Sequence, residues 1–292
     1  MKSHYIIKPE YFFKPINLYK KLRRLILSKK QSNTQEVKTS VGFSIKIKTN
    51  DAVGKAIYDF GVYELAVSEL IYRLIDKNSI CIDGGANVGF MSLLMAKRAN
   101  LGKVYSFEAS PEIGEILVNN AYRLNDFKNI DIRLKGLSNE KTKLRFKINN
   151  YNSGESKVTN TDDYDIEVDG VLLDEEIPPS EKICLFKLDV EGHELQVLEG
   201  AENLLSKHKI SHIIYEDHQG YPSNVSDLLE KHGYKILKLN KGFWKPLIGP
   251  PETIQHISYE PSNYIATIAK EYVREKLKPI GWQCFSIKNE EC

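Results

Sequence analysis

The chain has 292 residues, of which 41% are hydrophobic and 27% are charged, and its formal net charge is +2. This is the composition of a globular protein, long enough for one large α/β domain with extensions or for two small domains. The small net charge argues against nucleic acid as a partner. No stretch reaches the roughly 18 apolar residues of a transmembrane helix, and the first residues lack the apolar core of a signal peptide.

The four cysteines are far apart and form no C-x-x-C pair, so they predict neither a zinc site nor a redox dithiol. Cys81 and Cys184 fall within predicted buried strands, where a thiol acts as a small apolar side chain. We therefore expect a reducing compartment and a cytoplasmic location.

Residues 1–40 are predicted to form an extension of the main domain. Residues 11–27 have the pattern of a basic amphipathic helix whose shared apolar face consists of Leu18, Leu22, Leu25 and Ile26. Its positive charge comes from Lys20, Lys21, Arg23, Arg24, Lys29 and Lys30. The helix either packs its apolar face on the main domain or attaches residues 11–30 peripherally to an anionic membrane surface or a partner enzyme. Residues 31–39 are polar and predict a linker.

The main domain is predicted over residues 41–280, beginning with a strand at 43–48 and a helix at 64–75. Further strands are predicted near 79–83, 103–108, 130–137, 183–189, 211–217, 234–240 and 263–270. Helices are predicted near 88–99, 111–125, 194–208 and 224–232. Alternation of this kind indicates an α/β fold with a parallel sheet and helices on both of its faces.

Two regions interrupt the alternation. Residues 141–181 are polar and too long for a simple connection, so an insertion with short strands, or a lid near the site, is expected. Residues 241–262 are rich in proline and predict a loop excursion, and residues 281–292 predict a C-terminal tail. Four aromatic residues in these and neighbouring loops either stack on a sugar ring or anchor the loops: Tyr151, Tyr221, Phe243 and Trp244.

A cofactor site is predicted where the strand at 79–83 meets the following helix. Gly85 permits a tight turn and a close backbone approach to a ligand, Gly89 permits tight helix packing, and Asp83 accepts hydrogen bonds from the ligand or the loop. Asn87 lies within the same turn. The dinucleotide pattern G-x-G-x-x-G fits imperfectly, because Ala86 stands where a glycine admits the pyrophosphate. The turn therefore favours a ligand without pyrophosphate, such as S-adenosylmethionine.

Glu108 ends the next predicted strand, and an acid at this place typically binds ribose hydroxyls. The alternatives are a partner for the helix N-terminus that follows at Ser110-Pro111, or a solvated charge.

A reaction site is predicted from two further strand ends. Asp189, Glu191, His193 and Glu194 follow the strand at 183–189, and Glu216, Asp217 and His218 end the strand at 211–217. Ligands of open α/β sheets bind beyond the carboxyl ends of strands. The cluster offers a general base for a hydroxyl proton, and Asp189 with Glu216 or Asp217 offers oxygen ligands for Mg²⁺. Glu194 equally fits the first turn of a helix, His193 a helix cap and His218 a loop.

These residues together resemble the FkbM family of S-adenosylmethionine-dependent methyltransferases. The resemblance rests on the segments 83–89, 104–111 and 186–201, with support from 57–64, and covers roughly residues 55–270. It implies a Rossmann-like class I methyltransferase fold with a mostly parallel seven-stranded sheet, a reversed last strand and helices on both faces. Gly84 and Ser110 are small departures from the family pattern.

The resemblance also implies O-methylation of a hydroxyl on a sugar, glycan, glycolipid or related natural product. Carried over by position, Asp83, Gly85, Asn87 and Glu108 would bind S-adenosylmethionine. Asp189, Glu191 and His193 would face the reacting groups, with His193 or Glu191 as the base and Asp189 as an orienting residue or metal ligand. Acceptor choice is expected to depend on residues 1–40 and 141–181.

Two other functions remain open from the sequence. One is an NAD(P)-dependent oxidoreductase acting on a nucleotide sugar, against which stand Ala86 and the lack of a suitably placed Tyr-x-x-x-Lys pair. The other is a non-catalytic scaffold, against which stand the polar residues at every expected strand end. The sequence does not indicate an oligomeric state.

Overall fold

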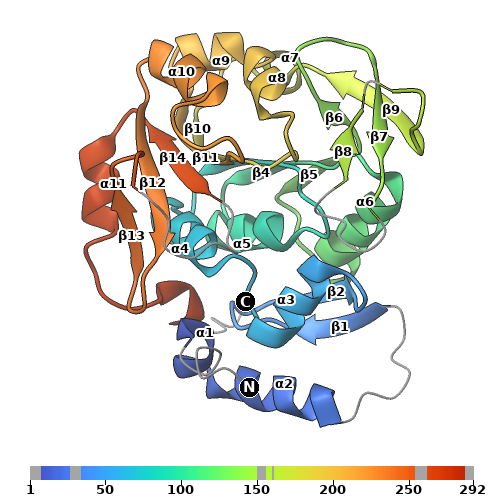
Figure 1. The fold of residues 1–292 in the computed structure, drawn as a ribbon, viewed down its shortest axis with the longest axis vertical. Coiled ribbons are helices and arrows are strands. Elements are labelled where there is room, and N and C mark those ends of the chain that lie inside the picture. The colour runs from blue at the N-terminus through green and yellow to red at the C-terminus, as the bar shows by residue number, and fades with distance from the viewer. Residues whose placement is uncertain (1–7, 27–33, 150–155, 160, 254–261, 287–292) are drawn as a thin grey trace.

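A mixed sheet of eight strands forms the centre of the molecule (Figure 1). The computed structural model describes residues 8–26, 34–149, 156–159, 161–253 and 262–286. Across the sheet the strands are β13 (Pro246–Gly249), β12 (Lys235–Lys241), β14 (Asn263–Thr267), β11 (Ile210–Glu216), β10 (Ile183–Leu188), β3 (Ile80–Gly84), β4 (Lys103–Phe107) and β5 (Ile130–Arg133).

The five strands β11, β10, β3, β4 and β5 are parallel to one another. Strand β14 runs antiparallel to both β11 and β12, which makes it the reversed last strand that the resemblance implies. The α/β class I methyltransferase fold is thereby confirmed. The sheet has one strand more than expected, because β13 forms within the predicted loop at 241–262 and pairs with β12.

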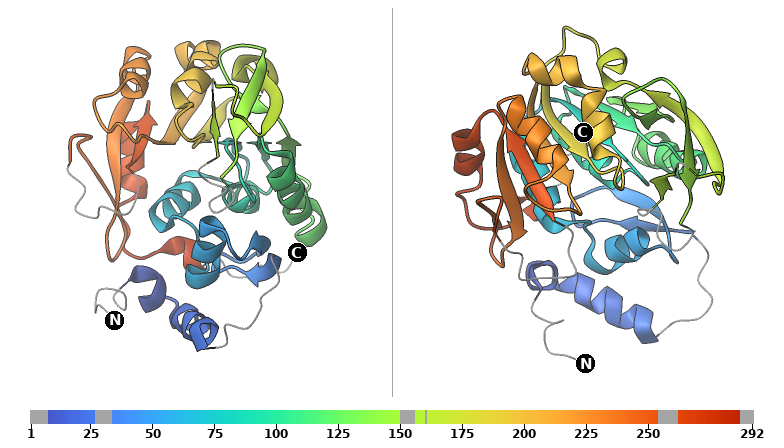
Figure 2. Two further views of the ribbon diagram at one scale, coloured as in Figure 1. Left: turned by 45° about the vertical axis from the view of Figure 1, so that its right-hand side comes forward. Right: turned by 45° about the horizontal axis from the view of Figure 1, so that its top comes forward.

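Helices cover both faces of this sheet, and each face has its own apolar core (Figure 2). One core includes residues of α4 (Leu65–Leu74), α5 (Phe90–Arg98) and α6 (Pro111–Val118). The other includes residues of α7 (Leu173–Glu176), α8 (Glu194–Glu199), α9 (Glu202–Ser206) and α10 (Asn224–Lys231). Helix α11 (Lys270–Lys276) follows β14 and contacts α4.

Three predicted elements are divided in the structure. The helix expected at 111–125 continues after Val118 as a π-helix over Asn119–Leu124, and its Asn120 is buried against β2 (Ser44–Lys48). The helix expected at 194–208 breaks at Gly200, where a Cβ atom would lie 2.0 Å from the carbonyl oxygen of Ser138. The strand expected at 130–137 becomes β5 and the separate β6 (Gly136–Leu137), because the two join different sheets.

The insertion at 141–181 contains the expected short strands. A small sheet has the order β6, β9 (Ile166–Val171), β7 (Lys143–Lys147) and β8 (Lys157–Val158). Its apolar residues include Leu144 and Val168, which are buried. This sheet stands beside the carboxyl ends of the central strands and contributes to the pocket described below.

The N-terminal region is more ordered than predicted. The expected linker at 31–39 contains β1 (Thr34–Lys38), which pairs with β2 and precedes α3 (Ala52–Phe60). The expected helix at 11–27 is two helices, α1 (Pro9–Phe12) and α2 (Pro15–Ile26), and α2 contacts α3.

Of the apolar face expected on this helix, the described side chains are those of Leu18, which is half-buried, and Leu22, which is exposed. The other predicted residues of this region lie outside the described part of the chain, either in their side chains or entirely: Lys20, Arg23, Arg24, Leu25, Ile26, Lys29 and Lys30.

The described part of the expected C-terminal tail, residues 281–286, is packed on α4. It contains a short 3₁₀-helix, Gln283–Ser286, and buries Trp282 and Cys284. Among the described helices, none has both the length and the apolar character required to cross a bilayer.

Candidate active site

Four neighbouring strands, β4, β3, β10 and β11, end at the same edge of the sheet. A pocket at this edge is lined by the loops that follow β3, β4 and β10 and by Glu216 at the end of β11. The small sheet closes one side with apolar residues, among them Phe146, Val158 and Ile166. One pocket therefore joins residues predicted for the cofactor and residues predicted for the reaction. Those that line it are Gly85, Asn87 and Glu108 of the first group and Asp189, Glu191, His193 and Glu216 of the second.

The loop after β3 uses its own backbone donors. The N–H groups of Gly85 and Ala86 donate to the carbonyl oxygen of Phe107, at 3.1 and 2.9 Å. The N–H of Asn87 donates to Glu108 Oε2. The N–H of Val88 donates to Asn87 Oδ1, and that of Gly89 donates to the carbonyl oxygen of Ala86. All five N–H groups from residue 85 to 89 thus have partners in the protein. A cradle for a pyrophosphate needs such groups to point at the ligand, so the loop does not suit a dinucleotide.

The two glycines of this loop have structural reasons that the sequence did not reveal. Gly85 has φ +78°, and a Cβ atom there would lie 1.8 Å from the carbonyl oxygen of Asp189. Gly89 has φ +94°, and a Cβ atom would lie 2.4 Å from Leu117 of α6. Gly85 therefore admits the neighbouring β10 loop, and Gly89 packs against a helix rather than against the strand.

Glu108 holds the β3 and β4 loops together at the cofactor end of the pocket. Its carboxylate accepts the N–H of Asn87 at 2.8 Å and that of Ser110 at 2.7 Å, so its expected role toward the following helix is also present. Burial raises the pKa of Glu108, while these two N–H donors lower it. Glu108 lines the pocket, and each of its oxygens has a second lone pair for a ligand hydroxyl.

Asp83 lies behind the loop and does not line the pocket. Its side chain is fully buried and accepts a hydrogen bond from Ser92 Oγ at 2.6 Å. Burial raises the pKa of Asp83, an effect that Lys187 opposes from 4.0 Å. The geometry favours a role in positioning for Asp83 over the direct cofactor contact that was expected.

Lys187 is a site residue that the sequence reasoning missed. Its Nζ lies 3.0 Å from Asp189 Oδ2 and 3.5 Å from the carbonyl oxygen of Gly85. Burial disfavours its charge, yet the carboxylates of Asp189 and Asp83 raise the pKa of Lys187 above its ordinary value. The sequence contained one indication of this role: Lys187 is the only charged residue of the apolar strand β10, and Asp83 and Asp189 lie at the ends of β3 and β10.

The reaction end of the pocket is strongly acidic. Burial, followed by the charges of Asp189, Glu64 and Glu191, raises the pKa of Glu216 to about 9. Glu216 is therefore a neutral carboxylic acid at pH 7 that can donate a hydrogen bond. Tyr63, also missed from the sequence, lines this end, and burial raises its pKa.

His193 lines the pocket at the start of α8, where its side chain forms no helix cap. Its Nε2 lies 3.1 Å from Ser138 Oγ, and burial lowers the pKa of the imidazole. A neutral imidazole at pH 7 is suited to accept a proton. Glu191, which adopts a left-handed backbone with φ 55°, lines the pocket beside it.

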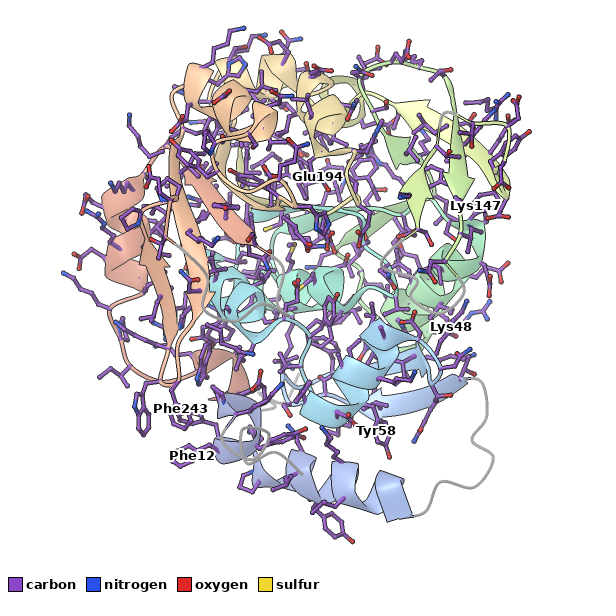
Figure 3. All side chains as sticks on the ribbon, viewed as in Figure 1. Phe12, Lys48, Tyr58, Lys147, Glu194 and Phe243 are labelled. Atoms are coloured by element: carbon purple, nitrogen blue, oxygen red, sulfur yellow. The ribbon has the colours of Figure 1, made fainter. Side chains whose placement is uncertain are left out.

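Two other candidates of the cluster have local roles or lie at the rim. Glu194 lies in the first turn of α8, as the alternative for it had it, and accepts the backbone N–H groups of Val190 and Gly192, so that it holds the β10 loop (Figure 3). His218 is exposed at the rim, with Nε2 3.2 Å from Glu216 Oε1 and 3.6 Å from Glu191 Oε2.

The structure does not assemble the expected Mg²⁺ site. Asp217 is turned to its own loop, where it accepts hydrogen bonds from Ser223 Oγ and the N–H of Gln219. Asp189 is engaged by Lys187. Within the described ranges, no group of three or more His, Cys, Asp or Glu residues is arranged to hold a metal ion.

The aromatic candidates for sugar stacking lie elsewhere. Phe243 and Trp244 belong to a cluster with Phe12 and Phe13, and the Tyr221 hydroxyl bonds to Glu230 of α10. None of them lines the pocket. Tyr151 is outside the described residues.

The family model of the methyltransferase FkbM domain matches residues 83–236, more than half of the chain, and these contain every strand end of the pocket. The chain belongs to the FkbM methyltransferase family. A curated relative, the hexuronic acid methyltransferase AglP of Haloferax volcanii, is 30% identical over 185 residues, which cover 61% of this chain and 73% of the relative.

Two solved methyltransferase structures are similar to this FkbM chain at low sequence identity. An rRNA methylase from Streptococcus thermophilus has a TM-score of 0.40 and 14% identity, covering 69% of this chain and 93% of the other. M. jannaschii TYW2, solved with AdoMet, has a TM-score of 0.43 and 13% identity, covering 82% and 87%.

Proposed function

We propose that this FkbM methyltransferase transfers a methyl group from S-adenosylmethionine to a hydroxyl oxygen of a sugar, glycan, glycolipid or related natural product. The observation that carries the proposal is the single pocket that joins Glu108 and the β3 loop to Asp189, Glu191 and His193. Donor and acceptor must meet in one water-poor site for an in-line displacement, and this pocket offers both ends of such a site.

The residues at the cofactor end fit S-adenosylmethionine better than a dinucleotide. The β3 loop has no spare N–H from Gly85 to Gly89, while Glu108 has lone pairs free for ribose hydroxyls. Phe107 and Leu137 provide apolar surface beside Glu108. S-adenosylmethionine, when bound, supplies a methyl group already activated on a cationic sulfur. In this proposal Gly85, Asn87 and Gly89 shape the loop, and Asp83 positions it through Lys187.

A hydroxyl acceptor needs a group that takes its proton, and we assign this role to His193. Its imidazole lines the pocket and is neutral at pH 7, because burial lowers its pKa. Asp189, held by Lys187, orients the reacting groups, and Glu191 is the second candidate for the base. A carboxylate acceptor would need no base at all.

A sugar acceptor is supported by the AglP relative, whose name describes a hexuronic acid methyltransferase. The small sheet is part of this proposal, because Phe146, Val158 and Ile166 line the pocket and are placed to contact an acceptor. Cys81, Cys184 and Cys284 are free thiols, which supports the proposed cytoplasmic location.

The first test is isothermal titration with S-adenosylhomocysteine, with NADH as the control. We expect the protein to bind S-adenosylhomocysteine and not NADH, because the β3 loop leaves no cradle for a pyrophosphate. Binding of NADH alone would turn the function toward an oxidoreductase, and binding of neither by folded protein toward a scaffold.

A second experiment determines whether the transferred methyl group forms an ether or an ester. Methyl-labelled S-adenosylmethionine and uronic-acid-containing saccharides are incubated with the enzyme, and the product is treated with mild alkali. We expect the label to be retained, because a methyl ether resists alkali. Release of the label as methanol would show a methyl ester and contradict the hydroxyl acceptor.

A further inference from the structure

The outer side of α1, α2 and the loop after β12 presents large apolar side chains to solvent. Phe12, Ile16 and Tyr19 are 57%, 54% and 61% exposed, and Leu22 and Trp244 are 42% and 52% exposed. We call these five residues the outer apolar face. Within this face, α1 and the loop after β12 are in contact, because the Phe12 ring lies 5.7 Å from the Trp244 ring and 5.3 Å from the Phe243 ring (Figure 3).

The two helices are attached to the domain by buried polar residues and by Tyr11. Asn17 is fully buried and donates to Ser40 Oγ at 3.1 Å and to the carbonyl oxygen of Phe60. Glu10 is buried, with Oε1 3.2 Å from Lys241 Nζ. The Tyr11 ring is buried 5.4 Å from the Phe60 ring. A surface helix of a globular protein normally buries its apolar stripe, whereas the residues of the outer apolar face stay exposed.

The charge of this segment is entirely positive. Between Glu10 and Glu36 the chain has no acidic residue and seven basic ones. Lys14 lies over the Phe285 ring and Lys21 lies 3.9 Å from Asp59 of the domain. The other five are Lys20, Arg23, Arg24, Lys29 and Lys30. Lysine and arginine combined with exposed tryptophan, tyrosine, phenylalanine and leucine characterise helices that lie in the interface of an anionic bilayer. Protein interfaces, in contrast, are depleted of lysine.

We propose that the outer apolar face docks the enzyme on an anionic membrane surface, with α2 lying in the plane of the headgroups. The apolar side chains would enter the boundary between headgroups and acyl chains, and the positive charge of the segment would attract anionic lipid. Docking of this kind needs no spanning helix.

The docked face is directly connected to the pocket. Asn17 bonds to Phe60, and Tyr63, three residues further, lines the reaction end, as does Val53 of α3, which α2 contacts. Docking would therefore hold the pocket near the bilayer, where the acceptor would be a saccharide carried by a lipid. This consequence for the acceptor rests on the proposed function, whereas the docking itself does not.

The test is co-sedimentation of the full chain with vesicles, without cofactor or acceptor, so that failure of the proposed reaction leaves it unaffected. The vesicles contain phosphatidylcholine alone or mixed with phosphatidylglycerol. We expect binding to the mixed vesicles that high salt weakens. The triple variant Ile16→Ser/Tyr19→Ser/Trp244→Ser should lower the partition coefficient by about tenfold or more, because it removes buried apolar area.

The matched control is Leu101→Ser/Ile268→Ser, which removes two apolar residues that are 67% and 41% exposed. They lie at the amino ends of the parallel strands, at the edge of the sheet opposite the pocket. It should bind as the wild type does, and thermal unfolding should show that both variants fold. Equal binding by the triple variant and the wild type would overturn the proposal. So would a lack of binding to anionic vesicles, which would make the face a docking site for a protein.

Discussion

The ammonium group of Lys187 lies between the carboxylates of Asp83 and Asp189, on the strand that forms the floor of the site. A buried charge of this kind is retained only where opposite charges compensate its desolvation. Lys187 thereby holds the Asp189 side chain in place, next to Glu216, whose pKa is raised to about 9 by burial and by neighbouring carboxylates. Carboxyl groups with raised pKa values are a common feature of active sites.

The assignment of His193 as the base predicts a specific pH dependence. Since burial lowers the pKa of His193 below 6.5, the imidazole is neutral at pH 7, and kcat/KM should fall as the pH drops through that lowered pKa. His193→Gln should lose about 10²- to 10⁴-fold in kcat and also lose this acidic limb. Binding of S-adenosylhomocysteine should be retained.

The matched control for this variant is His232→Gln, since His232 pairs with Glu202 away from the pocket. It should keep both the rate and the pH profile. If His193→Gln keeps the acidic limb, the base is another group, and Glu191→Gln becomes the variant to measure.

At the level of single residues, the sequence predicted which strand ends line the pocket but not what each side chain contacts. Glu108, Asp189, Glu191 and His193 line the pocket, because strand order brings their loops together. Asp83 and Asp217 do not, since Lys187, Ser92 and Ser223 engage them. Such partners depend on register between strands and on loop conformation, which a periodic pattern does not contain.

The C-terminal segment shows how an element without a strong pattern becomes part of the core. Arg73 and Glu69 of α4 form a fully buried ion pair at 2.6 Å. Arg73 also donates to the carbonyl oxygens of Lys276, Pro279 and Gly281, while Glu69 accepts the N–H groups of Gln283 and Cys284. The pair therefore satisfies the backbone of a segment that has little regular structure of its own.

Removal of one partner of this pair should be strongly destabilising. Arg73→Met leaves the Glu69 carboxylate buried without its cation and should lower the free energy of unfolding by about 3–5 kcal/mol. Urea unfolding measures this change, and limited proteolysis should show earlier cleavage near residue 280.

The control is Lys278→Met, which removes only the exposed pair with Glu275 and should cost about 0–1 kcal/mol. Equal effects of the two substitutions would show that the C-terminal segment does not depend on the buried pair.

The regular elements were predictable to the extent that apolar runs alternate with helical periodicity. The strands from β3 to β5 and from β10 to β12 follow that alternation, and β14 was found as the last strand. The segments β1, β13 and 281–286 were assigned to linker, loop and tail. Pairing with β2 and β12, and the polar contacts of Glu69 and Arg73, order these segments. Such tertiary contacts outweigh weak local propensity.

At the scale of the whole molecule, none of the five residues of the outer apolar face lines the pocket. Asn17 of α2 links the two regions through its hydrogen bond to Phe60, three residues before Tyr63. The pocket is formed by the carboxyl ends of the sheet and the small sheet, whereas the face belongs to α1, α2 and the β12 loop (Figures 1 and 2). Cofactor binding and membrane docking should therefore be separable by mutation.

This separation predicts the response of thermal stability to ligand. S-adenosylhomocysteine at 100 times its Kd should stabilise the native state by about 2.7 kcal/mol, which for a chain of this size raises Tm by about 4–8 °C. Because Ile16, Tyr19 and Trp244 do not line the pocket, the triple variant should show the same increase, measured by scanning calorimetry without vesicles. Glu108→Gln should show a smaller increase in Tm, since a neutral amide accepts hydrogen bonds from the Asn87 and Ser110 N–H groups and from ribose hydroxyls less strongly. A triple variant that loses the increase would show instead that α2 and the pocket act as one cooperative unit.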